Sequence, residues 1–174
     1  KSENARVRKK KISTILRGEG RDVTLFDAYL MVDWSASSVP KGGKDSIWVG
    51  LVVREERDLS VAVPENPRTR SAAVGRVRDL LRSLAARNLR VLVGFDFPYG
   101  YPRGLAAALG SPGDVEPWRA TWNRLSEAIH DSDRNENNRF EVASDMNAKL
   151  GPQPGPFWGC PSSRQTETLR STGC

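Results

Sequence analysis

Two aspartates each follow a short apolar segment of the kind that forms a buried β-strand. Asp33 follows residues 28–32 (AYLMV), and Asp96 follows residues 91–95 (VLVGF). Ligands of parallel sheets bind beyond the carboxyl ends of the strands, because side chains and loop amides converge there. Two carboxylates brought together repel each other unless a proton or a cation lies between them. The pair therefore predicts a catalytic site that binds Mg²⁺ or Mn²⁺; the alternative is that each Asp only caps its loop.

Two more acidic side chains are candidates to complete this metal site. Glu141 and Asp145 are four residues apart, so they share one face if the segment is helical. Glu167, in the carboxyl-terminal segment, is a further candidate. We predict Glu141 and Asp145 as metal ligands beside Asp33 and Asp96, because hard divalent cations prefer carboxylate oxygens. An ordinary solvated helix face is the alternative interpretation of Glu141 and Asp145.

Small and basic residues elsewhere in the chain are candidates for binding phosphate. In residues 35–38 (SASS), small side chains let backbone amides approach an anion, and Lys44 could neutralise its charge. Polar and aromatic residues mix around positions 139 and 164, which is typical of functional loops. The predicted phosphate or substrate contacts are Ser35, Ser37, Ser38, Lys44, Arg139 and Arg164. Residues 35–44 match no P-loop spacing, so an ordinary exposed loop is the alternative there.

The remaining aromatic and histidine side chains are interpreted as structural. Trp118, Trp122, Phe157 and Trp158 are expected to pack in the core or in a lid, and not to form a platform for stacking bases. His130 is the sole histidine and adjoins a polar run, which favours an exposed helix end. With one histidine and no close pair of cysteines, a zinc site is a poor prediction.

The strands that must position the two aspartates can be read from hydrophobic patterning. Residues 28–32 form an apolar run typical of a strand buried on both faces. Residues 47–53 and 59–63 predict two strands joined as an antiparallel hairpin, because the charged link between them is short. Residues 90–96 predict a fourth strand, and its arrival over a helix predicts that it lies parallel to the first through a right-handed crossover.

Helices are predicted between and after these strands. The first covers residues 69–87, with Arg70 off the apolar stripe that is formed by Ala73, Val77, Leu80, Leu81 and Leu84. Three more are predicted at residues 103–109, 117–130 and 140–150. The chain is therefore predicted to consist of a basic leader (1–24), an α/β domain with a mixed sheet (25–150) and a Pro/Gly-rich tail (151–174).

The net charge of +6 is carried by the leader. Residues 1–21 contain eight Lys or Arg and two Glu, whereas the remaining residues contain nineteen basic and nineteen acidic side chains. Residues 8–11 (RKKK) can bind phosphates without reading sequence; the alternative is a solvated terminus. With no apolar stretch long enough for a membrane span and only two cysteines, a cytoplasmic protein is predicted. The start at Lys1 and the unfinished tail predict a partial gene product.

Two short motifs resemble a known family. Residues 32–36 (VDWSA) and 94–98 (GFDFP), within roughly residues 27–104, resemble uncharacterised bacterial domains with a predicted ribonuclease-H-like fold. The resemblance implies that Asp33 and Asp96 match the two acids that hold Mg²⁺ on neighbouring strands of ribonuclease-H-like nucleases. The helix after the third strand offers only Asp79 as the further acid of those nucleases. Residues 155–159 and 164–167 resemble a proteobacterial branch often labelled as cofactor-biosynthesis proteins.

These observations favour a Mg²⁺-dependent hydrolase of phosphodiester bonds that acts on a nucleic acid or a nucleotide. The first alternative is a nucleotide-binding module related to the actin-like ATPases, in which Asp33 and residues 35–38 would cradle phosphates. The second is a non-catalytic domain linked to cofactor biosynthesis. A hydrolase requires a third carboxylate near the aspartate pair, whereas a nucleotide-binding module requires a second phosphate loop.

Overall fold

The computed structural model describes residues 25–55, 58–111 and 113–173, and the predicted leader (1–24) lies outside them. The chain divides into two compact units. Of the described residues, the first unit contains 25–35, 42–55, 58–68 and 72–96, and the second contains 36–41, 69–71, 97–111 and 113–173.

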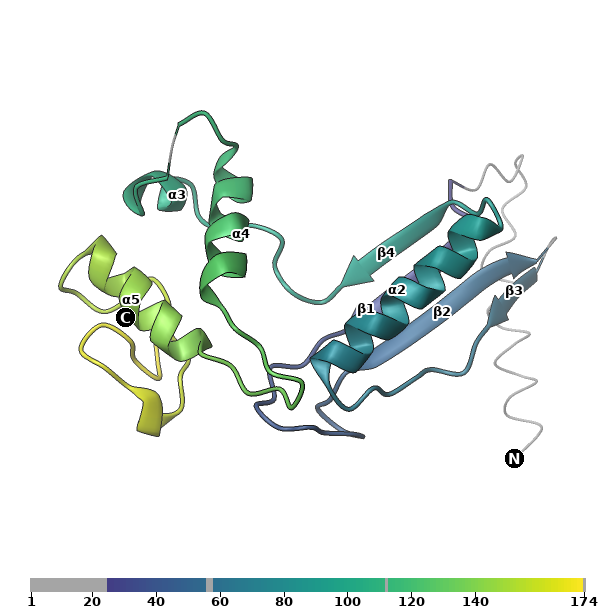
Figure 1. Cartoon of the computed structure of the whole chain (residues 1–174), viewed down its shortest axis with the longest axis horizontal. Coiled ribbons are helices and arrows are strands. Elements are labelled where there is room, and N and C mark those ends of the chain that lie inside the picture. The colour runs from purple at the N-terminus through teal and green to yellow at the C-terminus, as the bar shows by residue number, and fades with distance from the viewer. Residues whose placement is uncertain (1–24, 56–57, 112, 174) are drawn as a thin grey trace. The chain divides into compact units, whose positions relative to one another are not determined.

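The first unit is built on a four-stranded mixed sheet with the order β3-β2-β1-β4 (Figure 1). The strands are β1 (Ala28–Asp33), β2 (Trp48–Glu55), β3 (Asp58–Val61) and β4 (Val91–Phe95). β2 pairs antiparallel with β1 and β3, whereas β4 pairs parallel with β1. The predicted hairpin and the predicted parallel pairing are both confirmed.

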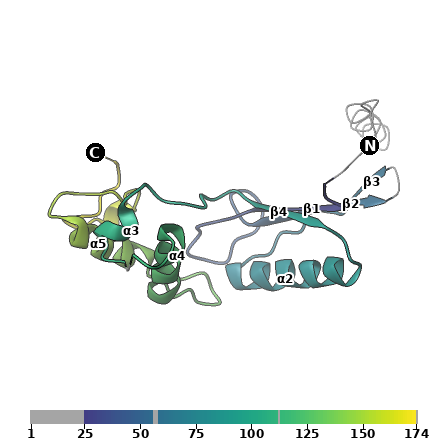
Figure 2. The ribbon, with the colours of Figure 1, turned by 90° about the horizontal axis from the view of Figure 1, so that it is seen from above.

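Helix α2 (Arg70–Ala86) connects β3 to β4 and covers one face of the sheet (Figure 2). The predicted apolar stripe of this helix is confirmed, because its members pack against the inward side chains of β1 and β2. The core between the helix and the sheet contains Leu30, Val32, Ile47, Val49, Ala73, Val77 and Leu80.

The prediction that β1 is buried on both faces is wrong. Its burial alternates, because Ala28, Leu30 and Val32 are buried towards α2 while Met31 is 47% exposed on the other face. Met31 pairs with Gly94 of β4, and a Cβ at position 94 would lie only 2.5 Å from the Met31 sulfur. The Met31 side chain therefore fills the space above a glycine and does not point into a second core. An apolar run alone cannot distinguish these two situations.

The second unit is helical and loop-rich. Its elements after β4 are α3 (Leu105–Ala108), α4 (Pro117–Ala128), α5 (Arg139–Leu150) and the 3-10 helix η1 (Ser162–Arg164). Each of the three predicted helices is therefore present, with α3 shorter than expected. Their shared core contains Leu105, Leu109, Val142 and Met146, with Leu125, Ile129 and Phe157 packed against it. The chain is thus an α/β protein with a helical carboxyl-terminal part.

Three tryptophans lie at the surface and not in this core. Trp118 and Trp122 on α4 are 51% and 40% exposed, and Trp158 in the carboxyl-terminal loop is 64% exposed. The prediction that they pack in the core or in a lid is wrong, although it is confirmed for Phe157. The apolar contacts of α4 with this core come from Leu125 and Ala128, together with Ile129 at the end of the helix, and not from the indole rings.

A buried amide fastens the carboxyl-terminal loop to α5. Asn147 is fully buried, and its side-chain nitrogen donates to the carbonyl oxygens of Phe157 and Thr168, both at 2.8 Å. Its side-chain oxygen accepts a hydrogen bond of 3.0 Å from the Phe157 amide. Because these bonds satisfy backbone groups that no regular element pairs, they hold residues 154–170 in a defined conformation despite the lack of periodic sequence.

Candidate functional site

Asp33 and Asp96 lie side by side at one end of the sheet of the first unit. Asp33 is the last residue of β1, and Asp96 directly follows β4. The parallel register pairs Val32 with Phe95, so the next residue on each strand is an aspartate. The Asp96 amide continues the ladder by donating to the Val32 carbonyl oxygen at 3.3 Å. Strand pairing therefore fixes the neighbourhood of the two carboxyl groups.

Trp34 holds this end of the sheet in place. Its backbone amide donates a hydrogen bond of 2.7 Å to Oδ1 of Asp96, which orients that carboxylate. Its indole meets the Phe95 ring edge to face, with ring centroids 6.3 Å apart, and packs against the core beneath α2. One residue thus links both strand ends through its backbone and its side chain.

Asp96 changes the protonation equilibrium of Asp33. The pKa of Asp33 is raised above its usual value, first because the Asp33 and Asp96 side chains share a hydrogen bond, which requires a proton. Slight desolvation by neighbouring atoms and the negative charge of Asp96 raise the pKa further. Both side chains are exposed at the surface of the unit. Both carboxyl groups are consequently open to solvent.

The donor set of this pair fits a divalent cation. Mg²⁺ in proteins is typically held by one or two carboxylates, keeps several water molecules and takes further oxygen ligands from substrate phosphates. Asp33 and Asp96 supply two carboxylates that water and substrate can reach. Across residues 25–55, 58–111 and 113–173, no group of three or more His, Cys, Asp or Glu side chains is suited to holding a metal ion.

The other predicted metal ligands lie on α5 in the second unit. Glu141 is in the first helical turn and forms an ion pair of 2.6 Å with Arg164. These two residues were predicted for different roles, as a metal ligand and as a phosphate contact, and the structure brings them together. Asp145 is one turn further along the same helix and is exposed.

The predicted phosphate contacts are divided between the two units. Ser35 and Lys44 belong to the first unit, where the Ser35 hydroxyl donates to the Asp45 carbonyl oxygen at 3.3 Å. Ser37 and Ser38 belong to the second unit, where the Ser37 hydroxyl donates to the Val39 carbonyl oxygen at 2.8 Å. The hydroxyl groups of Ser35 and Ser37 stabilise loop turns, and a phosphate-binding role for them stays a prediction.

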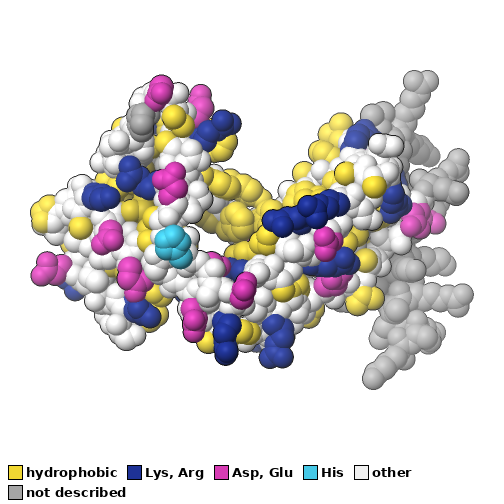
Figure 3. Space-filling view, in the orientation of Figure 1, with side chains coloured by type: hydrophobic (Ala, Val, Ile, Leu, Met, Phe, Trp, Pro, Cys, Tyr) yellow, Lys and Arg dark blue, Asp and Glu magenta, His cyan; other side chains and the backbone are white. Residues whose placement is uncertain are grey.

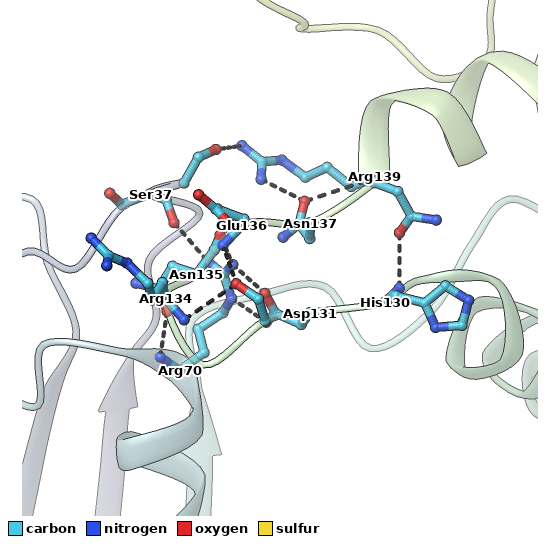
Figure 4. A network of polar contacts seen from close by, with 12 residues as sticks. Ser37, Arg70, His130, Asp131, Arg134, Asn135, Glu136, Asn137 and Arg139 are labelled. Atoms are coloured by element: carbon cyan, nitrogen blue, oxygen red, sulfur yellow. Dashed lines mark hydrogen bonds and ion pairs between the residues drawn. The ribbon is translucent and has the colours of Figure 1, made fainter.

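Arg139 contacts another of the predicted residues within the second unit. Its guanidinium donates to the Asn137 side-chain oxygen at 2.8 Å (Figure 4) and to the Ser38 hydroxyl at 3.4 Å. It also lies over the Phe140 ring. Partial burial and the neighbouring positive charge of Arg70 lower the pKa of Arg139. The direct hydrogen-bond acceptors of this cation are thus neutral groups.

Sequence patterning missed the polar centre of the second unit, which is Arg70. This residue was expected off the apolar stripe of its helix, and its side chain is nevertheless only 8% exposed. It binds both carboxylate oxygens of Asp131, at 2.5 and 2.6 Å, and donates to the carbonyl oxygens of Ser37 and Asn135 (Figure 4). The ion pair lowers the pKa of Asp131. Asp131 is 61 positions away in sequence, so local periodicity carries no signal for the contact.

Comparisons with known proteins give no indication of what these sites do. Among the described residues, no helix is both long enough and apolar enough to cross a membrane. Comparison of the chain with models of protein families, with curated proteins and with solved structures found no match. The function must therefore be inferred from the chemistry of the residues themselves.

Proposed function

We propose that this protein is a divalent-metal-dependent hydrolase of phosphodiester bonds, with Asp33 and Asp96 as its catalytic acids on a ribonuclease-H-like sheet. The observation that carries the proposal is the placement of two exposed carboxyl groups at the carboxyl ends of two neighbouring parallel strands, where Asp96 raises the pKa of Asp33. This is the edge at which sheets with parallel strands bind their ligands.

The electrostatics of the pair favour a cation. Two adjacent carboxylates cannot both ionise without repulsion, and the raised pKa of Asp33 expresses that conflict. A bound divalent ion removes the conflict and lets both groups ionise at neutral pH. The strand order β3-β2-β1-β4, with a parallel β1–β4 pair, also supports the ribonuclease-H-like part of the proposal.

Each residue of the site has a distinct task in this proposal. Asp33 and Asp96 bind the cation with one carboxylate each, and the Trp34 amide keeps Asp96 in a fixed orientation by its 2.7 Å hydrogen bond. When bound, Mg²⁺ would polarise a phosphoryl oxygen and lower the pKa of a water ligand. Because the side chains are exposed, a phosphodiester can approach the pair directly.

A hydrolysis assay tests the proposal. Bis(p-nitrophenyl) phosphate and a single-stranded oligonucleotide are incubated with the protein in Mg²⁺, in Mn²⁺ and in EDTA. We expect metal-dependent cleavage that Asp33→Asn and Asp96→Asn each reduce about 100-fold or more, since a metal contributes several kcal/mol of transition-state stabilisation. Asp58→Asn, which alters an exposed acid on β3, is the matched control and should retain activity.

The outcome that contradicts the proposal is equally specific. Cleavage in EDTA, or equal rates for wild type and for both aspartate variants, would show that the pair is not the catalytic site. Circular dichroism of each variant establishes that a fall in activity does not come from unfolding.

A further inference from the structure

The carboxyl-terminal loop of the second unit lines a cavity of about 210 Å³ that is open to solvent on one side. This volume is smaller than that of the pockets of about 300–1,000 Å³ that enclose whole drug-sized ligands, so it suits one ring system of a larger ligand. Its walls come from two stretches of the same loop: Pro154, Gly155, Pro156, Phe157, Trp158, Arg170, Thr172 and Gly173.

The walls of this cavity are held in place by hydrogen bonds beneath them. The buried Asn147 amide binds the backbone of Phe157 and Thr168 and so fastens both stretches to α5. The Gly155 amide donates to the Thr168 carbonyl oxygen, and the Gly159 amide donates to that of Arg170 at 2.9 Å, which joins the stretches to each other. The cavity is therefore preformed, and ligand binding need not include the entropy cost of ordering the loop.

Trp158 gives the cavity an aromatic wall. The preceding residue, Phe157, is anchored in the core and meets Tyr101 edge to face at 6.2 Å. Gly173 lies against the indole, since a Cβ at that position would be 3.3 Å from a ring carbon of Trp158. The indole nevertheless remains 64% exposed, so much of its surface is available to a planar ligand.

Arg170 gives the cavity a positive charge. In the part of the chain that the structure describes, no carboxylate forms an ion pair with its exposed guanidinium. Thr172 adds a hydroxyl group to the same lining. A rigid aromatic surface beside an exposed arginine is the combination that binds a nucleobase and its phosphate in proteins that recognise single strands.

We propose that this cavity binds one nucleotide of a single-stranded nucleic acid, with the base stacked on Trp158 and a phosphate contacted by Arg170. This proposal extends the proposed function, because it names single-stranded nucleic acid as the substrate class. That the bound strand is then hydrolysed rests on the proposed function. Binding itself requires no metal ion.

Binding is measured by fluorescence anisotropy of a labelled ten-nucleotide strand, with the full chain in EDTA at low salt. Stacking contributes about 1–3 kcal/mol per base, so Trp158→Leu is expected to weaken binding about 5- to 150-fold, while Trp158→Phe keeps most of it. Arg170→Gln is expected to weaken binding and to reduce the slope of log K against log salt by about 0.7.

The second unit offers a matched control for this experiment. Trp118 and Arg119 are an exposed tryptophan–arginine pair, with the guanidinium 5.2 Å from the indole centroid, and neither lines the cavity. Trp118→Leu and Arg119→Gln should therefore leave binding close to that of wild type. If they reduce affinity as much as the cavity variants do, the binding is a general surface effect and the proposal is overturned.

The remaining outcomes separate the claims. Undetectable binding by wild type, or equal binding by Trp158→Leu, overturns the cavity as a nucleotide site. Competition by a free mononucleotide as effective as that by the strand overturns its assignment to single strands. If the strand binds through Trp158 but no variant or metal affects hydrolysis, the cavity stands and the proposed hydrolase fails.

Discussion

At the residue scale, the protonation state of Asp33 and Asp96 determines whether this pair stabilises or destabilises the folded protein. The pKa of Asp33 is raised in the folded chain from an ordinary value of 3.8, chiefly by the hydrogen bond that it shares with Asp96. A raised acid pKa stabilises the fold below the unfolded-state value, and that contribution disappears as pH rises through the folded value. Above that range and without a cation, two negative charges face each other at the strand ends.

Asp33→Asn should therefore stabilise the metal-free protein at pH 7. The substitution removes one of the facing charges while keeping a side chain of the same size, which can donate to Asp96. We expect a higher Tm than wild type in EDTA at pH 7 and a smaller difference at pH 3, measured by circular dichroism. Saturating Mg²⁺ should reverse the order, because only wild type gains the binding energy of a metal held by both carboxylates.

Asp58→Asn, at an exposed acid of β3, serves as the control and should shift Tm little at either pH. We would expect no rise in Tm if Asp33 and Asp96 did not repel each other. A Tm for Asp33→Asn equal to or below that of wild type, in EDTA at pH 7, would therefore contradict this repulsion.

Replacing Arg70 should strongly destabilise the second unit. Arg70→Met leaves the Asp131 carboxylate without its counter-ion and two carbonyl oxygens without their donor. Breaking a buried ion pair costs about 3–5 kcal/mol, and we expect the lower end because the Asp131 side chain is 35% exposed. Urea unfolding of the full chain measures the change.

A second ion pair in the same unit provides the control. Arg164 and Glu141 are 2.6 Å apart, but their side chains are 55% and 52% exposed. Exposed pairs contribute only up to about 1 kcal/mol, so Arg164→Met should change the free energy of unfolding little. Equal destabilisation in the two variants would mean that burial is not what gives the Arg70 contact its strength.

At the scale of elements, local patterning predicted most of the first unit. The strands, the helix and the antiparallel hairpin follow from hydrophobic spacing and short links, and the parallel β1–β4 pair follows from the intervening helix. The adjacency of Asp33 and Asp96 was predictable for the same reason. The side on which Met31 is exposed was not, because the run 28–32 is apolar at every position.

The second unit was less predictable because its polar contacts join residues far apart in sequence. Arg70 meets Asp131 across 61 positions, and Asn147 binds Thr168 across 21 positions. Neither contact leaves a periodic trace in the sequence. The exposure of the tryptophans was mispredicted for a different reason. An indole at helical spacing suits a core position and a half-exposed surface position equally well.

Asn147 should determine the order of the carboxyl-terminal loop. Asn147→Ala leaves the carbonyl oxygen and the amide of Phe157 without the partner that they have in the structure, at about 1–3 kcal/mol for each buried unsatisfied group, and it removes one of the two donors to the Thr168 carbonyl oxygen. We expect the unfolding free energy to fall by about 3 kcal/mol and hydrogen exchange to accelerate in residues 154–170. Asn123→Ala, an exposed change on α4, should alter neither; faster exchange spread evenly over both units would contradict a local role.

At the scale of the whole molecule, positive charge is concentrated at one end of the sequence. Residues 1–21 carry eight basic and two acidic side chains, while the rest of the chain is balanced. On the face shown in Figure 3, Lys and Arg side chains are interspersed with Asp and Glu within each unit. Residues 8–11 (RKKK) are therefore expected to supply a sequence-independent, salt-sensitive part of any nucleic-acid binding.

Replacing Arg8, Lys9, Lys10 and Lys11 with Gln in the full chain tests whether the leader and the cavity contribute separately to nucleic-acid binding. The slope of log K against log salt should fall by about 0.7 for each phosphate of a single strand that these side chains no longer neutralise. The ratio of affinities between wild type and Trp158→Leu should persist in the charge-neutralised background. Disappearance of that ratio would mean that the leader and the cavity do not act independently.

The central claim is that Asp33 and Asp96 together hold one divalent cation, and direct metal titration tests it. Mn²⁺ is titrated into wild type, Asp33→Asn, Asp96→Asn and the control Asp58→Asn, with free ion followed by electron paramagnetic resonance. Removal of an outer-shell partner typically lowers metal affinity by about 10- to 100-fold. Removal of a direct ligand should lower the affinity by at least as much. We predict one site in wild type and in the control, weakened to at least that extent in each pair variant. Equal affinity in wild type and Asp96→Asn would contradict the shared site.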